Sequence, residues 1–249
     1  MKNKNKKMST RPVALVTGGA SPLGSAICRQ MAEQDMNIAV HYGKSKTRSL
    51  VLKAELESKG VEVFLVSADL SNSLKTEKLV QQVGNHFGRI DLLVNSASIF
   101  EPTPLAESNW KQWQNILNVN SLAPVVLAVS ALPWLQKHRG VMVNITDIYG
   151  EMPILKDHAA YSASKAALIF LTRYLALALG DQVRVNAVSP GVITFPGHYT
   201  SAQQKKLIQK SALKRQGKPE EIAQAVWFLY SNQFVTGQVL RVDGGRFIS

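Results

Sequence analysis

Cysteine is nearly absent from this chain. One cysteine, Cys28, occurs in 249 residues, which excludes an internal disulfide. The five histidines are scattered, and no group of Cys and His has the spacing of a metal site. We therefore expect a cytoplasmic protein without a metal, because a chain without disulfides suits a reducing compartment. Cys28 lies in the first predicted helix, where a packed core thiol is expected rather than a nucleophile.

Long hydrophobic runs are also missing. No uninterrupted apolar run approaches the roughly 20 residues that span a bilayer. The basic start leads into the apolar segment 12–17, which is too short for the core of a signal peptide and lacks a cleavage pattern. The sequence therefore predicts a soluble protein that does not enter a membrane.

Acidic residues are few, with 17 against 29 Lys and Arg, and the net charge is +12. Four of the positive charges lie in the first eight residues, so we expect a disordered basic tail over residues 1–9 and one domain over 10–249. The other basic residues are spread along the chain rather than striped with aromatics. An anionic cofactor or substrate explains this surface as well as nucleic acid does, and we expect no nucleic-acid partner.

Short apolar runs rich in β-branched residues alternate with longer helical patterns. The runs predict seven strands: Val13–Thr17, Asn37–Tyr42, Val61–Ser67, Ile90–Asn95, Gly140–Thr146, Val183–Val188 and Gln238–Val242. Continuous apolar strands separated by helices indicate a mostly parallel sheet that is covered on both faces. Right-handed crossovers then give a Rossmann-like, doubly wound α/β fold in a single domain.

The turn after the first strand is rich in small residues. It runs from Thr17 and Gly18 through Ser21 and Leu23 to Gly24. Such a turn lets the backbone approach a pyrophosphate at the start of the next helix, although many α/β proteins use one merely to reverse the chain. Pro22 has no N–H, so neighbouring amides would have to hold the phosphate.

The end of the second strand lacks the acidic residue that would accept a hydrogen bond from the ribose of NAD. Instead it carries His41, Tyr42, Lys44 and Ser45, with Lys46 and Arg48 close by. These residues suit a 2′-phosphate and favour NADP(H), although a solvated basic helix start would look the same. Past the third strand, Asp69 and Leu70 are candidates for the adenine end, and Asp69 could equally cap a helix that begins near Ser71.

Tyr161 and Lys165 are four residues apart, so on a helix they share one face. A neighbouring ammonium favours the phenolate and would move the pKa of the tyrosine towards the range that a general acid needs. By itself this spacing is common, and a chance pair on a solvated helix remains open.

Taken together, the motifs resemble the short-chain dehydrogenase/reductase family over nearly the whole chain. They comprise Thr17-Gly18…Gly24, Asp69, Asn95-Ser-Ala97, Asn120, Tyr161-x-x-x-Lys165, Pro190-Gly191 and Asp243-Gly-Gly245. The resemblance implies that Tyr161 donates a proton to the substrate, that Lys165 holds the nicotinamide ribose and lowers the tyrosine pKa, and that Asn120 supports Lys165 through a water. It also implies that Asn95, Ala97, Pro190, Gly191 and Ile193 line the cofactor.

One position departs from the family pattern. Where a serine is usual after the fifth strand, this chain has Asp147, one residue farther from Tyr161 than is usual. An aspartate there resembles the pteridine reductase and dihydromonapterin reductase branch, with Thr146 as the fallback for the serine. In that branch the resemblance implies a substrate site at Ser98, Phe100, Asp147 and Tyr161. The arginine that such reductases often carry in the phosphate loop is replaced by Ser21-Pro22.

The chemistry of a pterin suits these residues. Phe100 could stack on the flat ring, Ser98 could bond its polar edge, and a carboxyl coupled to Tyr161 could supply the proton for a C=N nitrogen. Phe100 could equally be core, and Asp147 could bond a backbone amide. Around this site we expect a pocket border and a mobile lid over 195–206, the border formed by Tyr149, Met152, Leu155, His198 and Tyr199.

Three functions remain open from the sequence. The first is an NADPH-dependent reductase of a dihydropterin or dihydrofolate-like substrate. The second is a carbonyl reductase of 3-oxoacyl, sugar or steroid type, and the third is a non-catalytic NADP-binding protein. The apolar helix 166–179 has more apolar surface than one sheet face needs, and members of the family are usually tetramers, so we expect a homotetramer.

Overall fold

The computed structural model describes residues 9–107, 109–195, 197 and 199–249. Seven strands form one sheet in the order β3-β2-β1-β4-β5-β6-β7, and every pair of neighbours is parallel. The strands are β1 (Val13–Val16), β2 (Asn37–Tyr42), β3 (Val63–Ser67), β4 (Leu92–Asn95), β5 (Val141–Ile145), β6 (Arg184–Pro190) and β7 (Val239–Val242). The Rossmann-like fold expected from the sequence is confirmed, and each strand lies within two residues of its predicted bounds.

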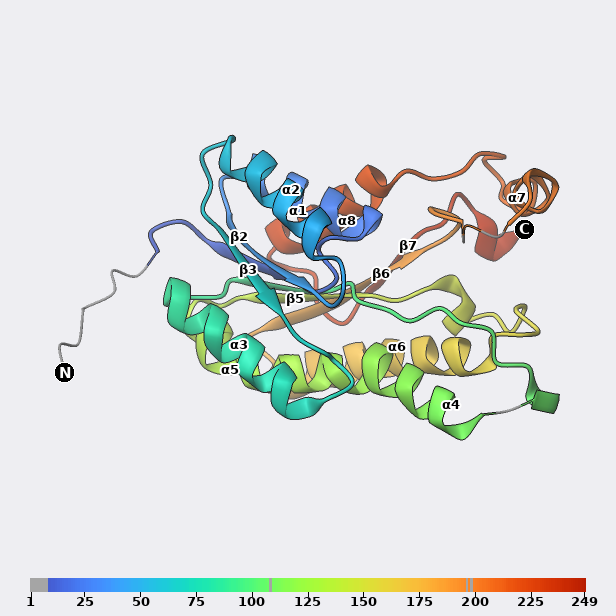
Figure 1. The fold of residues 1–249 in the computed structure, drawn as a ribbon, viewed down its shortest axis with the longest axis horizontal. Coiled ribbons are helices and arrows are strands. Elements are labelled where there is room, and N and C mark those ends of the chain that lie inside the picture. The colour runs from blue at the N-terminus through green and yellow to red at the C-terminus, as the bar shows by residue number, and fades with distance from the viewer. Residues whose placement is uncertain (1–8, 108, 196, 198) are drawn as a thin grey trace.

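Helices cover both faces of the sheet (Figure 1). One face carries α1 (Pro22–Glu33), α2 (Lys46–Glu57) and α8 (Pro219–Ser231). The other carries α3 (Ser73–Phe87), α4 (Trp110–Leu117), α5 (Ala123–Lys137) and α6 (Ala159–Leu179). A single turn of π-helix, Asn118–Leu122, joins α4 to α5. The short helix α7 (Ser201–Ile208) lies apart from both layers, beyond the carboxyl end of β6.

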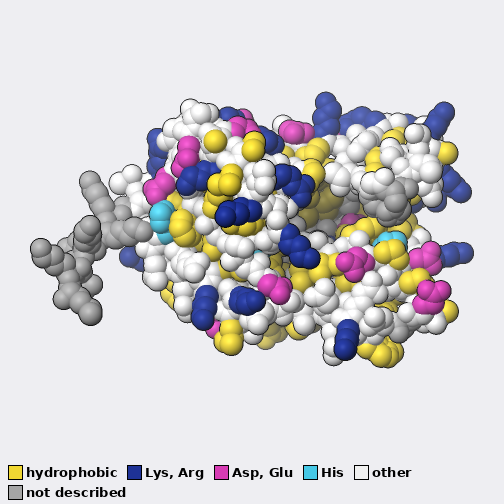
Figure 2. Space-filling model, viewed as in Figure 1, with side chains coloured by type: hydrophobic (Ala, Val, Ile, Leu, Met, Phe, Trp, Pro, Cys, Tyr) yellow, Lys and Arg dark blue, Asp and Glu magenta, His cyan; other side chains and the backbone are white. Residues whose placement is uncertain are grey.

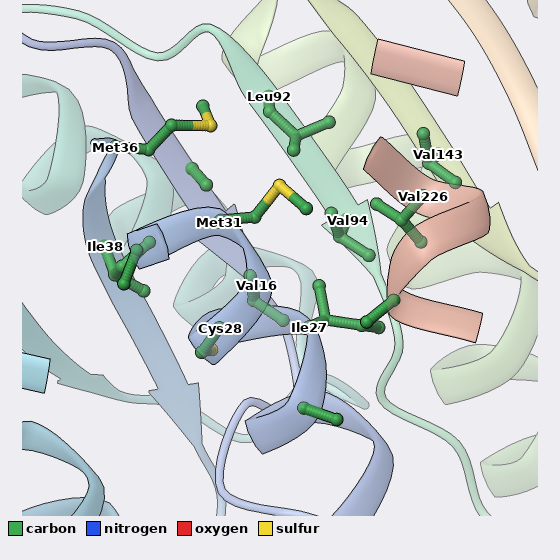
Figure 3. Packing of buried hydrophobic residues seen from close by; sticks show 14 of the residues in the cluster. Val16, Ile27, Cys28, Met31, Met36, Ile38, Leu92, Val94, Val143 and Val226 are labelled. Atoms are coloured by element: carbon green, nitrogen blue, oxygen red, sulfur yellow. The ribbon is translucent and has the colours of Figure 1, made fainter. Parts of the chain in front are cut away.

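The core consists of the apolar side chains between the sheet and its helices. Figure 3 shows Ile27, Cys28 and Met31 of α1 directed at the strands, with Val226 of α8 beside them. Cys28 is fully buried, and burial raises the pKa of its thiol to about 12. Apolar surroundings disfavour the thiolate, which is the reactive form, so Cys28 is an inert core thiol. The sequence predicted this role.

The start of α3 settles one question that the sequence left open. Asn72 caps this helix, and its side chain accepts a hydrogen bond from the backbone N–H of Lys75 at 3.0 Å. The Asp69 carboxylate instead accepts hydrogen bonds from the N–H and the hydroxyl of Ser71. These two bonds close a turn that precedes the helix. Of the two roles left open for Asp69, the cap of a helix beginning near Ser71 is therefore excluded, and the carboxylate stays at the surface.

The predicted tail was one residue too long. The backbone N–H of Ser9 donates to the carbonyl of Phe87 at 2.9 Å, and its hydroxyl accepts from the amide of Asn37 at 3.0 Å. Ser9 therefore belongs to the domain, while residues 1–8 lie outside the described part of the chain.

Two helical stretches, Trp110–Lys137 and Ala159–Leu179, are long and apolar enough to cross a membrane. The sequence prediction counted only uninterrupted apolar runs, and it missed both because polar residues interrupt them. Both stretches pack on the sheet and bury side chains in the core, which explains their composition without a membrane. Length and composition alone are weak evidence of a membrane span.

The sheet topology fixes where a ligand can bind. β1 lies between β2 and β4, so the chain leaves the carboxyl ends of β1 and β4 in opposite directions. A crevice forms at such a switch point, and open α/β sheets bind their ligands there. The glycine-containing turn after β1 and the segments after β4, β5 and β6 all meet at this edge.

Candidate active site

The turn between β1 and α1 is tight because two glycines leave room for it. A Cβ at Gly24 would lie 2.2 Å from the carbonyl oxygen of Gly18, a distance that no side chain tolerates. Gly18 itself has a φ of +62° and packs against the backbone of Ala97. Ser21 caps α1, and its hydroxyl accepts from the N–H of Gly24 at 3.0 Å. The turn thus presents bare backbone at the start of a helix, which is the form of a phosphate cradle.

Thr17 and Asn95 shape the neighbouring floor. The Thr17 hydroxyl is buried and accepts from the N–H groups of Ser96 and Ala97 at 3.0 and 3.1 Å. The amide of Asn95 donates to Asn144 at 2.8 Å, while its oxygen is buried without a partner among the described residues. The hydroxyl of Ser96 is also buried and has no hydrogen-bond partner among the described residues. Orphaned polar atoms at this edge are what a bound ligand would satisfy.

His41 does not face a phosphate. It is buried, its Nδ1 accepts from the N–H of Gly18 at 3.1 Å, and its Nε2 lies 3.1 Å from the carbonyl of Ala68. Burial lowers the pKa of the imidazole, so it is neutral and both nitrogens are engaged with backbone. The prediction that His41 binds the cofactor is corrected: it supports the glycine turn from behind.

The basic residues Lys44 and Arg48, which follow β2, remain candidates for binding a 2′-phosphate. Lys44 is exposed, and Arg48 donates to the Ser45 hydroxyl at 2.7 Å. Ser45 precedes α2 without capping it, since its side chain accepts nothing from the helix backbone. The hydrogen bond from Ser71 holds the pKa of Asp69 below its usual value, with Lys75 and Lys44 contributing less. Tyr42 is half-buried and Leu70 is buried.

Tyr161 and Asp147 form a hydrogen-bonded pair. Tyr161 leaves the first turn of α6, Asp147 follows β5, and the phenol donates to Asp147 Oδ2 at 2.6 Å. The other carboxylate oxygen accepts from the N–H of Tyr149 at 3.0 Å, so Asp147 bonds a backbone amide as well as the tyrosine. Thr146 donates its hydroxyl to the carbonyl of Val188. Asp147, not Thr146, therefore occupies the position beside the tyrosine.

The pKa values of this pair run against one expectation. Burial raises the pKa of Asp147 to about 6, despite the hydrogen bonds from Tyr149 and Tyr161. Burial and the carboxylate also raise the pKa of Tyr161 well above its usual value. Lys165 was expected to lower it, but a phenol that donates to a carboxylate keeps its proton. At neutral pH the proton of this hydrogen bond therefore stays on Tyr161, and Asp147 takes up a second proton as the pH falls towards 6.

Lys165 points under Tyr161. Its ammonium donates to the carbonyl of Ile145 at 2.8 Å and lies 5.6 Å from the centre of the Tyr161 ring. It is buried, and burial lowers its pKa to about 8. The sequence spacing of four thus places both side chains at one site, as predicted.

Asn120 lies in the π-helical turn and bridges two segments. Its oxygen accepts from the N–H of Ile99 at 2.8 Å, and its amide donates to the carbonyl of Ile99 and to the hydroxyl of Ser164. The residue is therefore both a helix irregularity and a support for α6. A water link from Asn120 to Lys165 stays a prediction.

A cavity of about 430 Å³ opens beside the pair. Most predicted pocket residues line it, together with several that were not predicted: Leu23, Ser96, Ser98, Phe100, Ile145, Thr146, Asp147, Tyr149, Leu155, Tyr161, Lys165, Pro190, Gly191, Val192, Ile193, Thr194, Phe195, Tyr199 and Leu207. Met152 is not among them, and His198 lies outside the described residues. Phe100 stacks on His158 with 4.3 Å between ring centres, so a ligand would have to stack on the opposite face of Phe100.

Arg246 was missed as a support of this site. It is buried near the C-terminus, donates to the carbonyl of Lys210 at 3.3 Å, and lies close enough to Tyr149 to oppose the rise in that residue's pKa. Arg241 forms an ion pair with Glu151. The C-terminal segment therefore braces the loop that carries Asp147. The sequence marked this segment only as part of a motif.

Comparison with known proteins places these features in context. The family model described as Enoyl-(Acyl carrier protein) reductase matches residues 18–246. A 3-oxoacyl-[acyl-carrier-protein] reductase of Staphylococcus epidermidis is 32% identical over 241 residues, which cover 94% of this chain and 98% of that protein.

Two solved structures are similar over nearly their whole length. A blue fluorescent protein from a metagenomic library, in complex with NADPH, is 32% identical with a TM-score of 0.90, covering 97% of this chain and 99% of that one. FolM Alternative dihydrofolate reductase 1 from Brucella canis, complexed with NADP, is 30% identical with a TM-score of 0.88, covering 98% and 97%.

Proposed function

The chain belongs to the short-chain dehydrogenase/reductase family of oxidoreductases, and we propose that it uses NADPH to reduce a C=N bond of a dihydropterin or dihydrofolate-like substrate. The observation that carries this proposal is the 2.6 Å hydrogen bond between Tyr161 and Asp147 at the wall of an apolar pocket. A carboxyl coupled to the tyrosine suits protonation of a nitrogen, whereas a serine suits polarisation of a ketone.

NADP(H) fits the residues at the carboxyl edge of the sheet. The bare backbone at Gly18 and Gly24 would hold the pyrophosphate. Lys44 and Arg48 would hold the 2′-phosphate, with Ser45 between them. Two similar solved structures, those with NADPH and NADP, support the same choice.

Pro190, Gly191 and Ile193 line the pocket at the end of β6, where the nicotinamide would lie. When bound, the cofactor supplies a hydride to the substrate carbon. Lys165, held by the carbonyl of Ile145, would bind the nicotinamide ribose next to Tyr161. The apolar wall formed by Leu155, Phe195 and Leu207 would keep water from the reacting atoms.

The protein supplies the proton. Tyr161 would donate its phenolic hydrogen to the substrate nitrogen and draw a replacement from Asp147. Because its pKa is about 6, Asp147 is protonated in a minority of molecules near neutral pH, and these molecules can return a proton to Tyr161. When Asp147 is protonated it can donate to the phenol oxygen, and this frees the Tyr161 hydrogen to turn towards the substrate.

A carbonyl reductase of 3-oxoacyl type is the second candidate. Its support is direct, because the curated relatives include 3-oxoacyl-[acyl-carrier-protein] reductases at 30 to 34% identity. By name these relatives favour it over the pterin substrate. The Asp147–Tyr161 pair and the similarity to a dihydrofolate reductase structure favour the pterin. Family membership leaves little room for the non-catalytic alternative.

Oxidation of NADPH followed in parallel with four substrates separates the two candidates. The substrates are dihydrobiopterin, dihydromonapterin, dihydrofolate and an acetoacetyl thioester. We expect at least one dihydropterin to be reduced with a kcat/KM well above that of the thioester. Activity on the thioester alone would refute the pterin assignment and support the second candidate.

The expected homotetramer has a candidate surface on α6. Phe170, Tyr174 and Leu177 are large apolar side chains exposed on this helix, at 67, 57 and 83%. Their spacing of four and three places them along one face, and a second copy would cover it. Gel filtration with light scattering tests this proposal: a stable monomer would contradict it, and Phe170→Glu should weaken the assembly.

A further inference from the structure

The chain between Asp181 and Glu220 contains no acidic residue. It carries seven basic ones, and this segment includes β6, the pocket wall after it and α7. In Figure 2 the Lys and Arg side chains gather along the upper right of the molecule, where Figure 1 places α7. The charge therefore accumulates at the mouth of the substrate pocket.

Four of the seven basic groups have internal or structural partners. Arg184 donates to three backbone carbonyls, Arg215 pairs with Glu221, and the charge of Lys218 interacts with that same glutamate and helps to lower its pKa. The ammonium of Lys214 donates to the carbonyl of Gln209. These four are explained by the fold alone.

The other three, Lys205, Lys206 and Lys210, are exposed, and within the described residues none forms a hydrogen bond or ion pair through its ammonium. Leu207, next to Lys206, lines the pocket. Helical rotation of about 100° per residue places Lys206 on the flank of α7, about 100° from Leu207, and Lys205 on the far side, about 160° from it. Lys210 follows Leu207 by three residues, and its carbonyl is fixed by buried Arg246.

We propose that Lys206 and Lys210 bind an anionic arm of the substrate, carboxylate or phosphate, that extends out of the pocket while the ring lies against Tyr161. This inference rests on the proposed pterin reductase function and names the substrate class more closely. Neither ammonium group is engaged by the described part of the protein, so both are available to an anion at the mouth. An anion at the mouth pairs with both, and its attraction is long-ranged enough to guide the substrate in.

The test compares a double variant, Lys206→Glu/Lys210→Glu, with a control of equal charge change, Lys205→Glu/Lys78→Glu. Lys205 lies on the far side of α7 and Lys78 on α3, away from the site. KM is measured for dihydrobiopterin, whose side chain is uncharged, for dihydrofolate, whose arm carries carboxylates, and for a phosphorylated dihydropterin. We expect the wild-type enzyme to have a lower KM for one of the two anionic substrates than for dihydrobiopterin.

We expect the double variant to raise KM for the anionic substrate roughly tenfold, to leave kcat and the KM for dihydrobiopterin unchanged, and to differ clearly from the control. Added salt should reproduce the effect in wild type. If KM rises for dihydrofolate the bound group is a carboxylate, and if it rises for the phosphorylated dihydropterin the bound group is a phosphate. Equal effects of both double variants, or no effect on any substrate, would overturn the inference while the reductase assignment stands. If no pterin is reduced at all, both fail.

Discussion

The proton held between Tyr161 and Asp147 gives the reaction a characteristic pH dependence. Burial raises the pKa of Asp147 to about 6. If the protonated carboxyl must reload the tyrosine, the active fraction falls tenfold for each pH unit above that value. At pH 7.5 about one molecule in thirty carries this proton. Half of the molecules carry it at pH 6, so wild-type kcat/KM for a dihydropterin should fall about fifteenfold between pH 6 and 7.5.

Asp147→Asn removes the titrating group and keeps the shape of the side chain. We expect it to lower kcat/KM at pH 6 by about 10² to 10³ and to flatten the profile in this range. Thr146→Val is the matched control, since it removes the neighbouring hydroxyl, which donates to Val188, and should leave the profile unchanged. The assay is NADPH oxidation in buffers of constant ionic strength. Two results would refute proton transfer from Asp147 to Tyr161. One is a wild-type kcat/KM that does not change from pH 6 to 7.5, and the other is an Asp147→Asn variant whose kcat/KM falls with pH as in wild type.

Three further outcomes follow from the structure. Tyr161→Phe should lower kcat by about 10² to 10⁴ with little change in the KM for NADPH, and full activity would show that the phenol is not the donor. Lys44→Ala with Arg48→Ala should raise the KM for NADPH about tenfold and leave that for NADH unchanged, which steady-state kinetics with both cofactors checks. His41→Ala leaves the Gly18 N–H and the partly buried Ala68 carbonyl without their His41 partner, so urea unfolding should show a loss of about 2–4 kcal/mol in the free energy of unfolding, and an unchanged midpoint would contradict the supporting role.

The fold was predictable because its signals are local and redundant. Each strand is a short continuous apolar run, and parallel strands that are buried on both faces have this composition. The order in which the runs alternate with helical patterns then leaves few topologies. The pair Tyr161 and Lys165 was found for a similar reason, since helical spacing alone brings residues four apart together.

The errors lie where long-range contacts decide the outcome. His41 follows the strand pattern, but its partners Gly18 and Ala68 are 23 and 27 residues away, so its supporting role has no local signal. The raised pKa of Tyr161 depends on a carboxylate 14 residues earlier and on burial, neither of which a spacing rule contains. Arg246 reaches Tyr149 across the fold, and no sequence pattern joins the two.

Aspartate in place of serine at position 147 decides the proposed substrate, and a ratio of two rate constants tests this role. The measurement is kcat/KM for a dihydropterin divided by that for an acetoacetyl thioester, in wild type and in Asp147→Ser. We expect a ratio well above one in wild type and a fall of at least about a hundredfold in the variant, through loss of dihydropterin reduction. A wild-type ratio below one, or a serine variant with an unchanged ratio, would contradict it.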